Sequence, residues 1–445
     1  PEEEVTEKDT VLDTFIKDAV TEEVEKEDGT KETVEKVPAK KMAKIVKRPV
    51  AINDIHPLWT KHPNECSDED YKEFYRKVFH DYKEPLFWIH LNMDYPFNLK
   101  GILYFPKINT EYESIEGTIK LYNNQVFVAD NIKEVIPEFL LLLKGVIDCP
   151  DLPLNVSRSA LQNDGFVKKI SDYITKKVAD KLSGMCKTDK ENYEKYWDDI
   201  NPFIKFGCLK DEKFAEKMND YIIFKNLDGK YLTLKECLEE NKEKHENTVF
   251  YVTDEVEQSQ YINMFKNEGI DAVILTHNID QPFITNMESK NENLKFKRID
   301  ADLSDSFKEE TSKDELKDMT EKLSKTFKDA LGKENLTVNV EKLKDASISS
   351  MITLSEESRR MQDMMKMYGM AGMDPNMFGA EGQTLVLNAN NDLVKYVAEH
   401  TDGENTKIIC EQLYDLAMLS HAPLSPEQMT GFIARSNKIM ELLAK

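Results

Sequence analysis

The 445-residue sequence predicts an α/β (α+β) protein in which two α/β units, joined by a helical segment, precede a smaller α+β domain that ends in a helical bundle. Three observations support this prediction. Runs rich in β-branched and aromatic residues alternate with longer amphipathic stretches, as in mixed α/β folds. One strand–helix–strand pattern fits within about thirty residues, which indicates a parallel pair of strands. Two capped amphipathic helices close the chain.

The first 50 residues are predicted to be a charged linker. An acid-rich stretch over residues 1–36 is followed by a basic stretch over 37–48 that contains no acid. Opposite charge blocks beside Gly29 and Pro38 favour a mobile, solvated segment, with at most a short helix or strand near residues 12–19.

Residues 51–305 are predicted to form a middle domain, whose first part, 51–185, is a large α/β unit. Its first helix is marked by Ser67, an N-cap residue with an acid three positions later. Asn123 and Asn124 provide turn chemistry between two short strands. The expected strands cover 98–104, 117–121 and 125–128, and the expected helices cover 135–146 and 166–182.

A helical connector over 186–235 and a small α/β unit over 236–305 complete this domain. In the small unit we expect a strand over 248–253, a helix capped by Asp254 and closed by Gly269, and a parallel strand over 272–276. Such units often bind nucleotides, but no glycine-rich loop follows either strand. A structural role is therefore favoured over an enzyme built on the 248–276 unit.

The C-terminal domain is expected over residues 306–445. A helix ends at Gly332, strands cover 336–340 and 384–388, and a capping box at 425–428 starts the last helix. Two terminal helices cannot bury their apolar faces against each other alone, so they either pack back on the domain or meet a second copy of the chain. The apolar positions of these two helices are Ile409, Leu413, Leu416, Phe432, Ile433, Ile439 and Leu443.

The composition excludes several classes of partner. The net charge is −23, from 83 acidic against 60 basic residues. Such a surface repels phosphate backbones and anionic lipids, so we expect neither nucleic acid nor membrane partners. No apolar run reaches the roughly 18 residues of a membrane helix. Six scattered cysteines without zinc-site spacing indicate reduced thiols, no metal centre and a cytoplasmic location.

One short segment carries the strongest chemical signal. Asn155 or Ser157 can cap a helix whose first turn then holds Arg158, with Gln162 on the same face. A cation is unfavourable at a helix N-terminus, which favours a functional role such as contact with an external phosphate. The alternative is an ordinary surface arginine.

A methionine-rich stretch gives the second signal. Met361, Met364, Met365 and Tyr368 form a stripe at helical spacing, followed by a glycine-containing run. Methionine is flexible and polarisable, so it suits surfaces that accept differing apolar partners, although core packing is the alternative. No P-loop, nucleophile-elbow or zinc-protease motif appears, so no self-contained catalytic site is expected.

The motifs LWTKHP, at residues 58–63, and LPLNVSR, at residues 152–158, are specific when they occur together. With the closing helices they make the chain resemble the ninety-kilodalton heat-shock chaperone family, most closely its bacterial branch. The resemblance runs in order from about residue 52 to residue 445, and it identifies residues 1–50 as the linker that follows a nucleotide domain absent from this sequence.

The resemblance implies a homodimeric chaperone that binds non-native client proteins. Arg158 would reach the γ-phosphate of ATP, held with Mg²⁺ in the missing domain, and Gln162 and Asn155 would lie beside it. The full-length parent would be an ATPase, whereas this fragment alone would be inactive and would bind no nucleotide. The expected client contacts are Trp59, Phe127, Met361, Met364, Met365 and Tyr368, and the closing helices would form the dimer interface.

This sequence departs from the family pattern at its expected middle-domain client surface. Asn124 and Gln125 stand where the family has two arginines, and the loop over 109–114 is short and polar. Two other functions remain as alternatives, namely a passive dimeric scaffold and an unrelated enzyme that uses the 248–276 unit.

Overall fold

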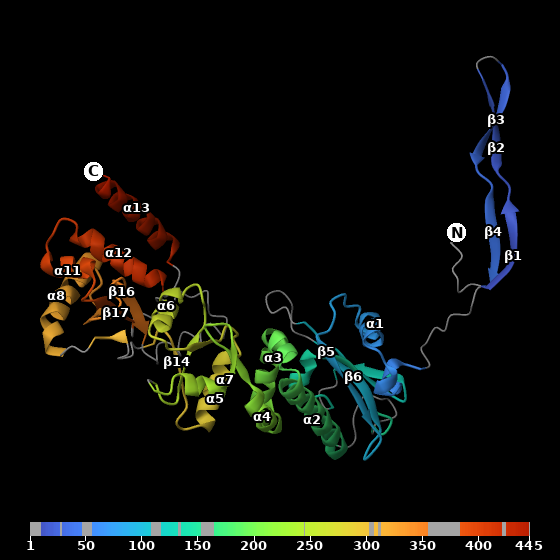
Figure 1. The fold of residues 1–445 in the computed structure, drawn as a ribbon, viewed down its shortest axis with the longest axis horizontal. Coiled ribbons are helices and arrows are strands. Elements are labelled where there is room, and N and C mark those ends of the chain that lie inside the picture. The colour runs from blue at the N-terminus through green and yellow to red at the C-terminus, as the bar shows by residue number, and fades with distance from the viewer. Residues whose placement is uncertain are drawn as a thin grey trace. The chain divides into compact units, whose positions relative to one another are not determined.

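A computed structural model describes residues 10–26, 29–46, 56–107, 117–131, 135–152, 164–243, 245–301, 307–309, 313–354, 383–420 and 424–444. The chain divides into two compact units, Pro1–Lys61 and His62–Lys445 (Figure 1). Within the described ranges, no helix combines the length and the apolar character that a membrane crossing requires.

The first unit is an antiparallel ribbon. Strand β1 (Thr10–Lys17) pairs with β4 (Lys40–Val46), and β2 (Val20–Glu25) pairs with β3 (Lys31–Val37). Gly29 adopts a positive φ of 78° in the turn between β2 and β3, a conformation that glycine reaches without strain. The described residues of this stretch form more regular structure than the sequence predicted, and β1 covers the short strand expected near residues 12–19. Backbone pairing orders the ribbon, because none of its described side chains is buried.

The large α/β unit is built on a five-stranded sheet in the order β5-β6-β9-β7-β8, antiparallel except for the parallel pair β7 and β9. The strands are β5 (Phe87–Met93), β6 (Leu99–Phe105), β7 (Ile119–Asn123), β8 (Val126–Asp130) and β9 (Lys144–Asp148). Helix α1 (Asp68–Phe79) begins at the predicted Ser67 cap, with Asp70 completing the capping box.

Successive side chains of a strand point to opposite faces of the sheet. Because this sheet has apolar side chains on both faces, helices cover both of them. On one face, Tyr104 of β6 donates a hydrogen bond to the carbonyl of Tyr71 in α1. On the other face, Phe105 packs against Phe203, whose helix shares a core with α2 (Asp164–Thr188). The predicted helix over 166–182 is thereby confirmed.

The helix predicted over 135–146 is wrong. A short 3-10 helix (Glu138–Leu142) is followed by β9, which lies between β6 and β7. A central strand is buried on both faces, so it reads as a continuous apolar run that periodicity cannot distinguish from a helix. Gly145 permits the close approach, since a Cβ there would lie 2.7 Å from the carbonyl oxygen of Ile102.

The connector consists of α3 (Lys190–Lys210) and α4 (Glu212–Met218), and it shares one hydrophobic core with the sheets on either side. A small antiparallel pair, β10 (Ile223–Lys225) and β11 (Tyr231–Thr233), and helix α5 (Leu234–Glu240) lead into the small α/β unit.

The small unit contains a parallel sheet in the order β13-β12-β14. Its strands are β12 (Thr248–Val252), β13 (Ala272–Ile274) and β14 (Lys295–Arg298), with α6 (Ser259–Asn267) and α7 (Asp280–Lys290). The predicted parallel crossover and the Gly269 stop are confirmed. Asp254 does not cap α6, which begins five residues later; its carboxylate instead accepts hydrogen bonds from the backbone N–H groups of Val256 and Glu257.

The C-terminal residues form a three-stranded sheet in the order β15-β17-β16, packed against helices. The elements are α8 (Lys313–Leu331), β15 (Thr337–Glu341), β16 (Ser350–Leu354), β17 (Gln383–Asn388), α11 (Asp392–Glu399), α12 (Thr406–Leu419) and α13 (Pro426–Leu443). Gly332 follows α8 with a positive φ of 64°, and Ser425 with Gln428 forms the predicted capping box of α13.

A buried ion pair fastens the connector to the small unit. The Lys205 ammonium of α3 donates to the Asp280 carboxylate of α7, and the two side chains are only 3% and 4% exposed. Lys205 also donates to Asn201, and Asp280 accepts the backbone N–H of His277 at 2.9 Å. Both charges are therefore compensated where water cannot reach them.

Replacing Asp280 by Asn should destabilise the folded chain by about 3–5 kcal/mol, because the buried Lys205 charge loses its counter-charge while the shape is retained. The matched control is Asp172→Asn, which breaks the exposed pair with Lys213 and should leave the unfolding midpoint nearly unchanged, because solvent screens that pair. Urea unfolding followed by circular dichroism measures both effects. Equal unfolding midpoints for the two variants would contradict the assignment.

Candidate functional site

The segment with the strongest sequence signal lies outside the described residues. Asn155, Arg158 and Gln162 fall within 153–163, so their contacts remain predictions. The structure does describe both ends of this segment. Strand β9 and the turn that follows it lead into the segment, and α2 begins directly after it.

The entry to this segment is held by polar contacts from neighbouring strands. The Asp151 carboxylate accepts the backbone N–H of Asn98 at 2.7 Å, and the Asn123 side chain donates to the carbonyls of Cys149 and Pro150 at 3.1 Å. Leu152 is buried in the core of the large unit. The chain is therefore held in place up to Leu152.

Two of the expected client contacts have opposite exposures. Phe127 on β8 is 47% exposed; its ring packs edge-on against Tyr122, and the Lys120 ammonium lies 5.7 Å from its centre. Trp59 is only 6% exposed, so little of its ring is available to a client protein. Met361, Met364, Met365 and Tyr368 lie outside the described residues.

The two closing helices divide the predicted interface residues into buried and exposed groups. Leu413 of α12 is 1% exposed and belongs to the core of its own domain, and Ile409 and Phe432 pack against that core. In contrast, Ile433 and Leu443 of α13 are 53% and 83% exposed. Leu416, Met440 and Leu442 are also exposed, and Ile439 is half-buried. The helices therefore combine an internal contact with an uncovered apolar surface.

A charged cluster fixes α13 against α12. The Arg435 guanidinium donates to Gln412 at 3.0 Å, to Glu411 at 3.2 Å and to Asp415. Gln412 in turn donates to Ser436 at 3.1 Å. Burial raises the pKa of Asp415, while Arg435 acts in the opposite direction. A planar guanidinium that serves several acceptors sets the angle between two helices more sharply than apolar packing does.

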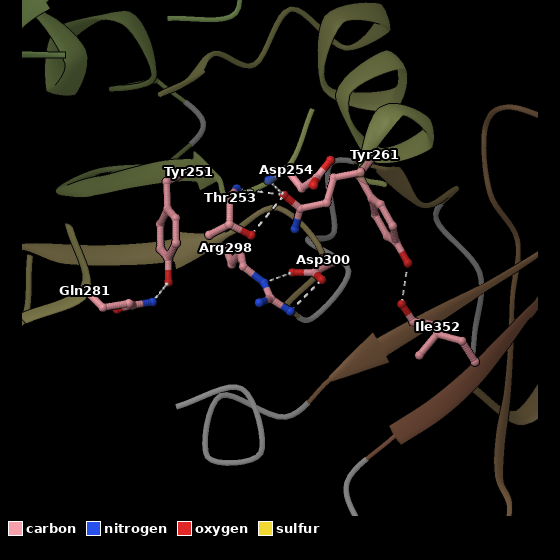
Figure 2. A network of polar contacts seen from close by, with 9 residues as sticks. Tyr251, Thr253, Asp254, Tyr261, Gln281, Arg298, Asp300 and Ile352 are labelled. Carbon is pink, nitrogen blue, oxygen red and sulfur yellow. Dashed lines mark hydrogen bonds and ion pairs between the residues drawn. The ribbon is translucent and has the colours of Figure 1, made fainter. Parts of the chain in front are cut away.

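A second network joins the small α/β unit to the C-terminal sheet (Figure 2). Tyr261 of α6 donates to the carbonyl of Ile352 in β16, and a shared apolar cluster surrounds this contact. Arg298, at the end of β14, forms a buried bidentate pair with Asp300, at 2.6 and 2.8 Å. Ala301 then forms an isolated parallel bridge to Leu354.

The described thiols are poor candidates for chemistry. Burial raises the pKa of Cys149, Cys208, Cys237 and Cys410 to about 12, which keeps each of them protonated and unreactive at neutral pH. Among the residues that the structure covers, no group of three or more His, Cys, Asp or Glu side chains is arranged to hold a metal ion.

Sequence reasoning missed the buried ion pairs and the Arg435 cluster. Lys205 did leave a signal, because it interrupts an otherwise apolar run between Phe203 and Leu209 in α3. The partners of Arg435 lie at least 20 positions away on the preceding helix, so only the packing of α13 against α12 reveals them.

The sequence of the chain is similar to that of known proteins. The family model described as Hsp90 protein matches residues 1–445. The chain is 42% identical over 366 residues to the chaperone protein HtpG of Bacteroides thetaiotaomicron. The aligned residues cover 79% of this chain and 53% of that protein. It is 42% identical to HtpG of Porphyromonas gingivalis over 78% of this chain and 52% of that protein, and 31% identical to HtpG of Helicobacter acinonychis over 83% and 59%. The chain thus spans about half the length of the curated relatives it matches first.

Proposed function

Since the chain belongs to the HSP90 family, we propose that it is the client-binding and dimerising portion of an ATP-driven molecular chaperone. In this proposal residues 51–305 form the middle domain and 306–445 form the dimerisation domain. The observation that carries the proposal is the uncovered apolar surface of α13, at the end of a domain whose own core is already filled. Contiguous exposed apolar side chains of this kind mark protein interaction surfaces.

ATP enters the proposal through the segment 153–163. Arg158, with Gln162 and Asn155, is assigned to the γ-phosphate of an ATP–Mg²⁺ complex held by a part of the protein outside this sequence. The donor set suits that task, because guanidinium and amide N–H groups are the usual partners of phosphate oxygens. The anchored turn that ends at Leu152 supports the assignment, since a positioned cation stabilises charge on a transferring phosphoryl group.

A cytoplasmic location is part of the same proposal, because all six cysteines are free. A passive dimeric scaffold is the second candidate, favoured by the same exposed apolar residues of α13. The two candidates differ in their effect on unfolded protein, which a scaffold would leave unchanged. The enzyme alternative based on the 248–276 unit gains no support from the buried, protonated thiols near its core.

The chaperone candidate predicts that the chain suppresses aggregation of a chemically denatured model protein on dilution. Changing Met361, Met364 and Tyr368 to Ser should reduce that suppression severalfold, because the apolar stripe that binds non-native segments is lost. The effect is measured by the light that the aggregating model protein scatters over time. Tyr82→Ser is the control, because Tyr82 is an exposed aromatic residue of the large α/β unit, at 95%, and lies outside both the methionine stripe and α13. Suppression that is absent in the unsubstituted chain would favour the scaffold.

The dimer assignment predicts that Ile433→Asp combined with Leu443→Asp yields monomers. Two carboxylates placed in an apolar interface would have to be desolvated without partners, which opposes association. Light scattering after size exclusion should give twice 51.5 kDa for the unsubstituted chain and 51.5 kDa for the variant. Leu393→Asp is the control, because that side chain is similarly exposed, at 49%, but lies on α11. A variant that stays dimeric would contradict the assignment.

The arginine assignment predicts that Arg158→Ala lowers ATP turnover by about a thousandfold in a longer chain that includes the ATP-binding part. ATP affinity should stay nearly unchanged, because the arginine contacts the phosphoryl group mainly in the transition state. Lys168→Ala, at an exposed position on α2, is the control and should turn over ATP at the unsubstituted rate. Unchanged turnover in Arg158→Ala would remove the assignment.

A further inference from the structure

The outer half of the N-terminal ribbon, formed by β2 and β3, has one apolar and one polar face. Val20 lies opposite Val37, and Val34 lies opposite Glu22. Because successive side chains of a strand alternate between faces, Val24 lies on the same side as these valines. The other face of the two strands carries only threonine, glutamate and lysine side chains. We call the four valines the valine face.

The valine face is open to solvent in the described part of the chain. Its four side chains are 44–52% exposed. Apolar β-branched residues at alternating positions are typical of a strand that buries one face. A two-stranded ribbon is only marginally stable in water unless a further strand or layer packs on it. The valine face therefore requires a covering layer.

The two halves of the ribbon carry opposite charge. Strands β2 and β3 together contain five acidic and two basic residues, a net charge of −3. Strands β1 and β4 contain one acidic and four basic residues, a net charge of +3. The two pairs follow each other along one ribbon (Figure 1). Two ribbons that lie side by side in opposite directions would thus bring −3 against +3 twice, within the roughly 8 Å over which such charges interact.

The inner half of the ribbon has the apolar side chains that the valine face requires. Phe15 lies opposite Met42 on one face of β1 and β4, and Ile16 lies on the other face. Phe15 and Ile16 are 52% and 70% exposed. Both faces of this half are therefore apolar and surrounded by lysines, which complements an acidic ribbon with a valine face. Since every copy of the chain carries both halves, a two-fold arrangement forms both contacts at once.

We propose that two copies of the chain associate through their ribbons in opposite directions, so that the valine face of each copy packs on β1 and β4 of the other. The contact is small, so it forms between copies that a larger interface already holds together, where the local concentration is about millimolar. In this respect it rests on the proposed dimer, but it adds a second contact surface that lies outside α13.

Photo-cross-linking of the whole 445-residue chain tests the proposal. The photoreactive residue p-benzoylphenylalanine replaces either Val34, on the valine face, or Thr33, its neighbour on the polar face. The two variants carry the same bulky group one position apart, so Thr33 is the matched control. Irradiation of the Val34 variant should give severalfold more covalent dimer on a denaturing gel. Mass spectrometry should locate the cross-link in β1 or β4 of the other copy.

The charge argument is tested by a charge swap within the Val34 variant. Lys41→Glu should lower the yield of covalent dimer by about threefold, because it weakens the attraction between the two halves. Adding Glu35→Lys should restore the yield. Lys41 lies opposite Ile16 and Glu35 lies opposite Thr21, so neither change places like charges opposite each other within one ribbon. An unchanged yield in Lys41→Glu, or no restoration by the second change, would overturn the proposal.

The other outcomes of cross-linking each contradict the proposal in a different way. A cross-link to β2 or β3 of the other copy would mean that the ribbons run in the same direction. A cross-link within one copy would assign the cover to the chain itself, and a cross-link to an added denatured protein would assign it to clients. No cross-link in a chain that light scattering shows to be dimeric would overturn this proposal alone. A monomeric chain without a cross-link would overturn the dimer through α13 as well.

Discussion

The ion pair between Lys205 and Asp280 is the constraint on which the middle of the chain depends. An ammonium group buried to this extent is tolerated only with a counter-charge and further hydrogen bonds, and both are present. Asp280 supplies the counter-charge for Lys205, and its carboxylate also accepts a hydrogen bond from the backbone N–H of His277. One carboxylate therefore holds α3, the start of α7 and the loop after β13 at the same time. Moving α3 away from α7 would leave a charge buried without its counter-charge, and moving the loop would remove a hydrogen bond from Asp280.

The contact between the small α/β unit and the C-terminal sheet has a different physical character. Its polar contacts include the Tyr261 hydrogen bond, two isolated bridges, an ion pair between Lys344 and Glu268 at 2.8 Å and a hydrogen bond from Gln260 to the carbonyl of Ser350. Its buried part consists mainly of apolar side chains such as Phe265, Phe307 and Met351. Apolar packing is strong but weakly directional, whereas a buried ion pair fixes distance and angle together. The Arg298–Asp300 pair stays within one segment, so it stiffens the end of β14 without fastening it to the neighbouring sheet.

How much of this fold the sequence could predict depended on whether the determining contacts were local. Capping boxes at Ser67 and Ser425, the stop at Gly332 and the parallel β12–β13 pair were all readable, because each depends on a few neighbouring residues. Strand β9 was mistaken for a helix, since burial on both faces removes the alternation that marks a strand. The ribbon of β1–β4 was missed because charge and composition dominated the local signal.

The candidate functional residues, too, could be predicted only where the signal was local in sequence. Family motifs identified Arg158 and the closing helices, but no local pattern could show that Leu413 is internal while Ile433 is exposed. That distinction depends on how α12 packs against α8 and the sheet, which is a tertiary fact.

The exposed apolar residues of α13 have to be reconciled with a net charge of −23. Like charges on two approaching copies repel over about 8 Å at physiological ionic strength, which disfavours association wherever carboxylates are unpaired. On α12, however, Glu411 is paired with both Lys407 and Arg435, and Asp415 is paired with Arg435, so two carboxylates face two cations. The apolar surface of α13 therefore lies beside compensated charge. The proposed dimer contact through α13 would therefore meet less repulsion there than on the rest of the acidic exterior.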